Sequence, residues 1–245
     1  MMHNFLTLVE KRQIASTTLE CVFEKPDGFI FQAGQNMTLV LEKLNYPDAR
    51  GARRIFTIAS APFEEGLKIS TRLTGSGFKR TLAELPKGAK VQFSGPRGKF
   101  HLLKELRKVI FVAGGIGITP IKSMITEVAH KSELPRAILF YSNATSDEAA
   151  YHDFFCRLAD TAADFSYVPS LTSSSKVNME SWPGERGRID FEMISRHVEF
   201  PHEYVFYLCG PPEMVDELVD ILRENDIDKE HIFSESFWGY ESVGN

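Results

Sequence analysis

Cysteine is scarce in this sequence, with three in 245 residues: Cys21, Cys156 and Cys209. They lie far apart and form no Cys-x-x-Cys pair, so the chain cannot supply the four ligands of a structural zinc site or an iron–sulfur cluster. We therefore expect no metal in this chain, and any iron–sulfur centre that it serves would lie on a partner protein.

Long apolar runs are also missing. No stretch approaches the roughly 18 consecutive apolar residues that a membrane-spanning helix needs. The segment Met1–Glu10 lacks the basic and apolar regions of a signal peptide. We therefore expect no membrane span, a cytoplasmic location and no nucleic-acid partner. The sequence contains no internal repeat and no low-complexity tract.

The composition is that of a globular protein, with 43% apolar and 25% charged residues. A length of 245 residues fits two domains. Although the net charge is −5, the segment Lys68–Lys108 holds eleven Lys or Arg against two acidic residues. This segment predicts either an anion site or docking of an acidic partner, and the alternative is a scattered, solvated face.

The first hundred residues are rich in short β-branched and aromatic segments that turn signals such as Pro26-Asp27-Gly28 separate. This pattern predicts an antiparallel β-barrel or sandwich, with one short helix near Phe78–Leu85. The strands that we expect are Thr17–Phe23, Met37–Leu41, Ile55–Ala59, Leu67–Leu73 and Lys90–Phe93.

Beyond residue 103, buried strands alternate with helical patterns, which predicts an α/β doubly wound parallel sheet. We therefore expect two domains, residues 1–103 and 104–245. The expected strands are Val109–Ala113, Ala137–Tyr141, Phe165–Val168 and Tyr204–Cys209, and the expected helices are Ile121–His130, Ala149–Ala159 and Glu213–Glu224.

Two motifs of the second half suit a nucleotide. Gly114-Gly115-Ile116-Gly117-Ile118-Thr119-Pro120 follows an apolar strand and opens a helix, so its backbone can approach a diphosphate at a helix N-terminus. The bland alternative is a tight strand-to-helix joint. The strand ending in Cys209-Gly210-Pro211-Pro212 would bring Cys209 to the ligand crevice, unless the thiol is merely a buried hydrophobe.

Two motifs of the first half suit a second anion. In Arg54-Ile55-Phe56-Thr57-Ile58, strand alternation places Arg54, Phe56 and Ile58 on one face and Thr57 on the other. The run Thr74–Leu82 is a glycine-rich turn before a helix whose first turn carries Lys79 and Arg80. Cations there oppose the helix dipole unless an anion is present.

In this order the motifs resemble the ferredoxin–NADP reductase superfamily, including the phthalate-dioxygenase-reductase-like flavoproteins, over about residues 5–240. The resemblance implies an NAD(P)H-dependent flavoprotein that passes a hydride to FAD and then electrons to a ferredoxin or another acceptor. It also implies that Arg54 binds a flavin phosphate, that Phe56 packs on the ring, and that Thr57 bonds near its reactive nitrogen. The remaining flavin residues that it implies are Ile58, Ser70, Arg72, Gly75, Gly77, Phe78, Lys79, Arg80 and Thr81.

The same resemblance assigns Cys209 to a place beside the nicotinamide and the C-terminal aromatics to the flavin, with Thr57, Cys209 and Glu235 as the catalytic group. The alternative for the aromatics is a packed C-terminal strand. The other residues that it implies for the two cofactors are Gly114, Gly115, Gly117, Ile118, Thr119, Pro120, Ser142, Asn143, Gly210, Pro211, Phe237 and Trp238.

Two departures leave alternatives open. Phe56 stands where the family usually has Tyr, and Lys79 stands where it has Ser or Thr, so FMN remains an alternative to FAD. Ser142–Glu148 contains no Lys or Arg for a 2′-phosphate, which favours NADH over NADPH. An obligate electron-transfer subunit and a non-catalytic nucleotide-binding module are the competing functions.

Overall fold

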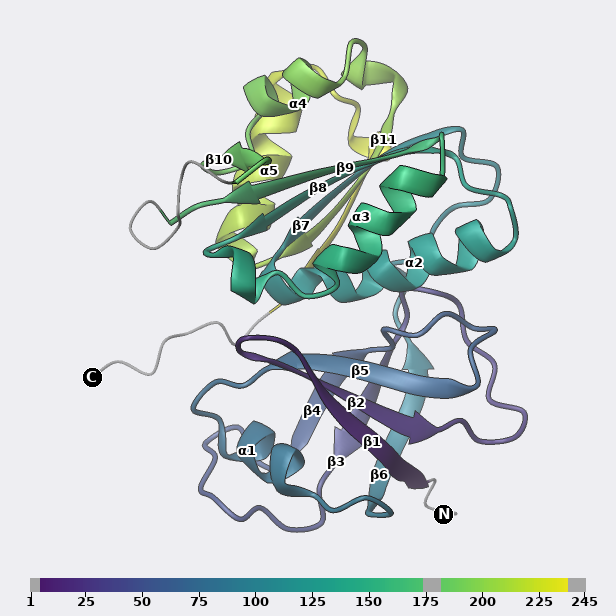
Figure 1. Cartoon of the computed structure of the whole chain (residues 1–245), viewed down its shortest axis with the longest axis vertical. Helices are drawn as coiled ribbons and strands as arrows, with labels where there is room; N and C mark the ends of the chain where they lie inside the picture. Colours follow the sequence, from purple (N-terminus) through teal and green to yellow (C-terminus); the bar gives the residue numbers. More distant parts are fainter. Residues whose placement is uncertain (1–4, 174–181, 238–245) are drawn as a thin grey trace.

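In the computed structural model, which describes residues 5–173 and 182–237, the strands form two six-stranded sheets. The first sheet is antiparallel, with the order β4-β3-β6-β1-β2-β5, and lies below the second in Figure 1. Its strands are β1 (Phe5–Ala15), β2 (Thr18–Glu24), β3 (Asn36–Val40), β4 (Arg53–Thr57), β5 (Gly66–Arg72) and β6 (Lys90–Arg97).

The antiparallel sheet curls around an apolar core. Its edge strands approach each other just beyond β4, where the backbone N–H of Ala59 donates to Lys68 O at 2.7 Å. Helix α1 (Gly77–Glu84) packs into the same core through Phe78 and Leu82. The predicted antiparallel sheet with one short helix is thereby confirmed, although the strand ladder itself is open rather than a closed ring.

The second sheet is parallel, with the order β10-β9-β8-β7-β11-β12, and confirms the predicted doubly wound sheet. Its strands are β7 (Lys108–Gly114), β8 (Arg136–Asn143), β9 (Phe165–Leu171), β10 (Glu185–Arg186), β11 (Val205–Gly210) and β12 (Ile232–Ser236). The helices are α2 (Ile118–His130), α3 (His152–Thr161), α4 (Phe191–His197) and α5 (Pro212–Glu224), with short 3-10 turns at Gly115–Gly117, Ser146–Glu148, Pro201–Glu203 and Lys229–His231.

Strand β7 explains why the helices cover both faces of this sheet. Its side chains alternate between two apolar cores: Val109 and Phe111 pack with α2 and α3, whereas Ile110 and Val112 pack with α4 and α5. A strand that is buried on both faces reads as a continuous apolar run, which is why the sequence identified it. Figure 1 shows the resulting three layers, with α2 next to the antiparallel sheet.

Three elements were missed in the sequence. Strand β1 contains Glu10-Lys11-Arg12-Gln13, and this polar run hides the alternation of a strand. Helix α4 is short, with an Asp190 side chain that accepts from Met193 N as its N-cap. Strand β12 has no fully buried residue, so its side chains lack the apolar signal of the other parallel strands.

Buried polar contacts join the two sheets. Ser123 Oγ of α2 donates to Ser60 O at 2.7 Å, and the nearby Lys122 pairs with Glu64 at 3.4 Å. Tyr151, at the start of α3, bonds Glu20 Oε2 at 2.8 Å. The turn between β1 and β2 also reaches across, since Ser16 N donates to Asp147 O at 2.8 Å. These bonds fix the orientation of one sheet relative to the other.

Candidate functional site

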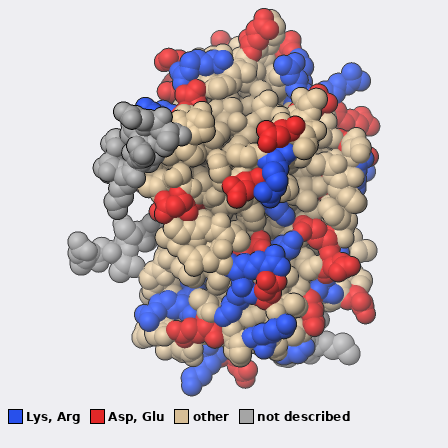
Figure 2. All heavy atoms as spheres, in the orientation of Figure 1, with Lys and Arg blue, Asp and Glu red and all other residues tan. Residues whose placement is uncertain are grey.

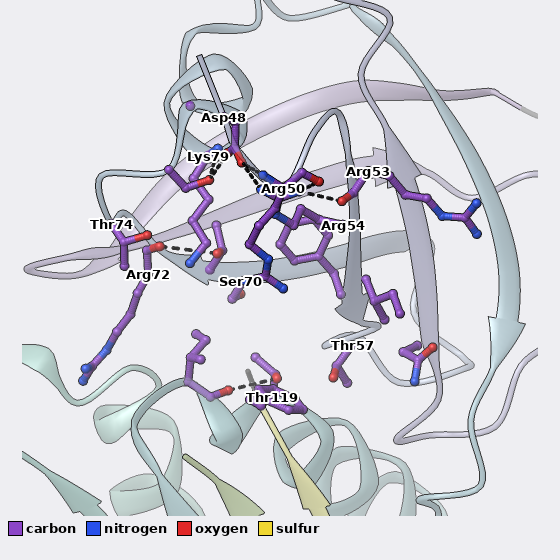
Figure 3. A pocket seen from close by; sticks show the side chains of 18 of the residues that line it. Asp48, Arg50, Arg53, Arg54, Thr57, Ser70, Arg72, Thr74, Lys79 and Thr119 are labelled. Carbon is purple, nitrogen blue, oxygen red and sulfur yellow. Dashed lines mark hydrogen bonds and ion pairs between the residues drawn. The ribbon is translucent and has the colours of Figure 1, made fainter. Parts of the chain in front are cut away.

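A cleft of about 890 Å³ lies where the two sheets meet (Figure 3). One wall comes from β4, β5 and the turn that opens α1, and the other comes from the start of α2 and the end of β12. Cofactor sites in proteins commonly have volumes of about 300–1,000 Å³. The cleft is therefore large enough for a nucleotide cofactor.

The cleft collects predicted residues from distant parts of the sequence. The predicted residues that line it are Arg54, Phe56, Thr57, Ser70, Arg72, Gly75, Gly77, Lys79, Thr119, Glu235 and Phe237. Residues that sequence reasoning missed also line it: Asn36, Pro47, Asp48, Ala49, Arg50, Arg53, Ile55, Thr71, Thr74, Ser76, Ile116 and Ser236. Charge density was the available signal for Asp48–Arg54, which holds four charged residues within seven positions.

Thr57 ends strand β4 with its side chain in the cleft wall. The residue is 6% exposed, and its Oγ1 is buried with no hydrogen-bond partner among the described residues. Leaving a buried hydroxyl unsatisfied costs about 1–3 kcal/mol. A ligand that supplies a hydrogen bond at this point would recover that cost.

Glu235 reaches the cleft from β12, where it pairs in register with Cys209 of β11. Its Oε2 is also buried and unbonded within the described residues, and burial raises the pKa of this carboxyl to about 7, while a hydrogen bond from Asn36 opposes the shift. The pKa of a catalytic acid or base works best near the operating pH. Glu235 is thus poised to exchange a proton beside the cleft.

Positive charge dominates the wall formed by the first sheet. The basic residues that line it are Arg50, Arg53, Arg54, Arg72 and Lys79, and the acidic residue beside them is Asp48. Burial, together with Arg50, Arg54 and Arg72, lowers the pKa of Lys79 to about 8. Burying an ammonium group among like charges is unfavourable, so this wall is suited to an anion.

The glycine motif and the Cys-Gly-Pro-Pro motif meet at the carboxyl ends of β7 and β11. A Cβ on Gly117 would stand 2.4 Å from Cys209 O, so only glycine allows this approach. Gly115 has φ +50 and lies against the guanidinium of Arg72, with 3.2 Å between its ideal Cβ and Arg72 Nη2. The first turn of α2 has no acidic side chain, which leaves its N–H groups available to an anion.

Cys209 is placed differently from our expectation. Its side chain is fully buried in the core beneath α2, and it does not line the cleft. Burial raises the pKa of the thiol well above its ordinary value. The thiol is therefore neutral, and its predicted place beside a nicotinamide remains a prediction.

Several other predicted residues lie outside the cleft wall. Ile58 and Phe78 belong to the apolar core, Arg80 stacks on Tyr46 at 3.6 Å from the ring centroid, and Thr81 Oγ1 accepts from Asn45 N at 3.0 Å. The remaining predicted residues that do not line it are Gly114, Gly115, Gly117, Ile118, Pro120, Ser142, Asn143, Gly210 and Pro211. Trp238 lies outside the described residues.

The basic segment Lys68–Lys108 is not a single patch. Lys68 pairs with Glu64, Arg72 with Glu148 at 3.1 Å, and Lys108 with Glu203. Figure 2 shows Lys and Arg interspersed with Asp and Glu on the face displayed. Docking of an acidic partner on this segment therefore stays a prediction.

Two searches cover the described ranges, residues 5–173 and 182–237. No helix there has the length and apolar character to cross a membrane. No group of three or more His, Cys, Asp or Glu side chains there is arranged to hold a metal ion.

Comparison with known proteins identifies the nucleotide motif. Residues 111–220 match the oxidoreductase NAD-binding domain family. Over 214 residues the chain is 29% identical to the reductase component of phenol 2-monooxygenase from a Pseudomonas species, a match that covers 85% of this chain and 58% of that protein. The chain spans 64%, 58% and 47% of the length of three such curated relatives.

Solved structures share the whole two-sheet arrangement. The flavohem-like FAD/NAD-binding domain of nitric oxide dioxygenase from Vibrio cholerae matches with a TM-score of 0.81 at 19% identity, over 96% of this chain and 98% of that one. A ferredoxin NADP+ reductase from Neisseria gonorrhoeae matches with a TM-score of 0.77 at 17% identity, over 96% and 99%. Together with the family match, these structures confirm the resemblance that the motifs predicted.

Proposed function

We propose that this chain, which belongs to the ferredoxin–NADP reductase superfamily, is a flavin-dependent reductase that takes a hydride from NAD(P)H and passes electrons to an acceptor. The observation that carries the proposal is the shared cleft: the Arg54–Thr57 and Gly75–Lys79 motifs form one wall and Thr119, Glu235 and Phe237 form the other. We regard the curled antiparallel sheet as the flavin-binding barrel of this family.

The residues present fit FAD on three counts. The cleft has a suitable volume, its unsatisfied Thr57 hydroxyl lacks a bond that a polar ring edge can supply, and its cations lack a matching number of anions. Phe56 and Phe237 would supply apolar surface for the ring, and Lys79 would bind phosphate. When bound, the flavin supplies the redox chemistry, because it can take a hydride from a reduced nicotinamide and release electrons.

The protein's own contribution is positioning and proton supply. The bonds between Ser123 and Ser60 and between Lys122 and Glu64 hold the two walls at a fixed separation, which favours a reactive geometry. Glu235, with its pKa near 7, would hold or release a proton beside the cleft. Cys209 acts through packing, since its buried thiol does not ionise near neutral pH.

The nicotinamide nucleotide would bind on the second sheet at Gly114–Pro120. This position suits a diphosphate, because the N–H groups at the start of α2 have no side-chain cap. Asn143, at the end of β8, is 4% exposed and its Oδ1 is unbonded within the described residues, so it is available to a ribose hydroxyl. With no base in Ser142–Glu148, we propose NADH as the preferred donor.

Absorption spectroscopy tests the function directly. We expect the purified protein, or the apoprotein mixed with FAD, to show an oxidised flavin spectrum that bleaches on anaerobic addition of NADH. A protein that takes up FAD without bleaching would be a binding module rather than a reductase. A protein that takes up neither FAD nor FMN would contradict the proposal.

Thr57 offers a test with opposite signs. Thr57→Val removes a buried hydroxyl that lacks a partner, so we expect the apoprotein to be as stable as wild type or more stable. The same change should weaken flavin binding by about tenfold, because the bound ring loses one hydrogen bond. Thr57→Ser, which keeps the hydroxyl, is the matched control. Loss of apoprotein stability in Thr57→Val with unchanged affinity would refute this role.

The acceptor is proposed from the relatives. The matched phenol 2-monooxygenase protein is described as a reductase component, which supports a role as the electron-transfer part of a larger system. We propose a ferredoxin or another acidic redox protein as the partner, docking on basic residues of Lys68–Lys108 that carry no ion pair. Electrostatic docking implies an association rate that falls with added salt.

A further inference from the structure

The position expected for a phosphate is already taken by a side chain of this protein. The carboxylate of Asp48 accepts bonds from Ser76 Oγ at 2.7 Å and from Phe78 N at 2.9 Å, at the start of α1. It also accepts from Arg50 N at 2.9 Å and pairs with the guanidinium of Arg54. A helix N-terminus and an arginine are the groups that bind phosphate in proteins, and here both bind Asp48.

Arg54 is fully engaged by protein oxygens. Besides its pair with Asp48, its Nη1 donates to the carbonyls of Arg50, Gly51 and Arg53 at 2.9, 2.8 and 2.7 Å. The guanidinium also lies over the Phe78 ring, 5.3 Å from its centroid. The side chains of Arg54 and Asp48 are only 9% and 5% exposed, so this is a buried ion pair with little capacity for a further anion.

The loop that carries Asp48 is tightly seated. A Cβ on Gly77 would stand 2.4 Å from Pro47 O and 2.6 Å from Tyr46 O, so the backbone of this loop rests directly on the first turn of α1. Asp48 therefore cannot swing aside without moving that loop. The carboxylate is a built component of the wall rather than a side chain that happens to lie nearby.

Two other cations of the same wall have no such partner. Across the described residues, no carboxylate lies at ion-pair distance from the guanidinium of Arg50 or the ammonium group of Lys79. Arg50 is exposed, Lys79 is half-buried, and both line the cleft (Figure 3). Arg53 points away from them in the same view, and Arg72 is paired with Glu148.

We infer that Asp48 neutralises Arg54 and caps α1 as an internal anion, and that Arg50 and Lys79 hold the phosphates of the bound flavin in place of Arg54. This inference rests on the proposed function and refines it. Arg54 becomes a positioning residue that fixes the loop 48–53, and with it the backbone that presents Arg50. The unusual Lys79 then has a purpose, since it restores the charge that Asp48 removes from the wall.

Binding of flavins with and without phosphate tests the inference. We expect Lys79→Gln and Arg50→Gln each to weaken FAD and FMN binding to the apoprotein by about tenfold, because a charge-assisted hydrogen bond is lost. Binding of riboflavin, which has no phosphate, should not change. Lys87→Gln, which removes an exposed lysine beyond α1, is the matched control and should match wild type throughout.

Arg54→Gln separates the two assignments. We expect it to lower the thermal midpoint of the apoprotein and to reduce affinity for FAD and riboflavin together. If Arg54→Gln instead lowers FAD affinity selectively at unchanged stability, while Lys79→Gln and Arg50→Gln do not, the inference is overturned. Unchanged FAD and FMN affinities in both Lys79→Gln and Arg50→Gln would also overturn it.

The failure of the proposed function would look different. If wild type binds no flavin at all, the flavin assignment fails, and inorganic pyrophosphate then tests the anion site alone. Calorimetric binding of pyrophosphate that Lys79→Gln and Arg50→Gln weaken, with Lys87→Gln unchanged, would support the assignment of the anion site. Absence of pyrophosphate binding by wild type, or equal binding by all variants, would overturn it.

Discussion

Gly117→Ala is expected to disable the nicotinamide side of the cleft. The added Cβ would stand 2.4 Å from Cys209 O, 2.6 Å from Cys209 C and 2.7 Å from Gly210 Cα, and all three are backbone atoms. Gly117 has φ −59, so the alanine suits the backbone angle and the whole effect comes from the collision. We expect the free energy of unfolding to fall by about 2–4 kcal/mol.

The effect on reaction should exceed the effect on stability. Relief of the collision requires β11 and the start of α2 to separate, which moves the nucleotide loop away from the cleft. A misplacement of about 1 Å costs on the order of 100-fold in rate, so NADH-driven flavin reduction should slow by about that factor. Stopped-flow absorption of the FAD-loaded protein measures it.

Gly88→Ala is the control for this substitution. Gly88 lies in the turn before β6 with φ +86 and open space around it, so alanine there costs backbone strain of about 1 kcal/mol without a collision. We expect that variant to reduce flavin at the wild-type rate. Equal stability and equal rates in the two variants would show that the close approach at Gly117 has no functional role.

Glu235→Gln is expected to change how the protein responds to pH. Burial raises the pKa of Glu235 from 4.5 to about 7 in the folded state, so the folded protein binds a proton that the unfolded chain has released. Stability therefore falls as pH rises from about 4.5 to about 7, and it is constant above that range. Glutamine does not titrate, so the variant should lose about 2–3 kcal/mol less across this window.

The same carboxyl should set the pH profile of the reaction. If Glu235 exchanges a proton in the cleft, the rate of flavin reduction in wild type changes around pH 7, and Glu235→Gln removes that change. The nearby ionisable group is Cys209, whose thiol remains protonated in this range. Denaturant titrations and stopped-flow rates at several pH values measure both effects. Parallel curves for wild type and variant would contradict the role of Glu235.

The sequence was informative where local chemistry dominates. The run Val109–Ala113 followed by Gly114–Pro120 predicted a buried strand, a tight turn and a helix, because apolar run, glycine and proline each act on their own backbone. The strand that carries Arg54 and the turn before α1 were equally visible. The shared cleft followed from these motifs, because the family resemblance placed both walls in one protein.

Contacts between distant segments could not be predicted in this way. Asp48 and Phe78 are 30 positions apart, and only the folded loop brings that carboxylate to the start of α1. Cys209 shows the same limit: the end of a parallel strand borders the crevice, but strand alternation turns this side chain toward the core shared with Tyr207. Position along a strand and direction of the side chain are separate questions.

The turn between β1 and β2 couples the fates of the two sheets. Ile14 and Ala15 pack against the apolar core of the parallel sheet, and Ser16 bonds Asp147 beyond β8. Melting of either half would expose this apolar surface and break the bond, so neither half retains its full free energy once the other is lost. The chain therefore behaves as one cooperative unit, and separating it near residue 103 would leave two weakened fragments rather than two independent proteins.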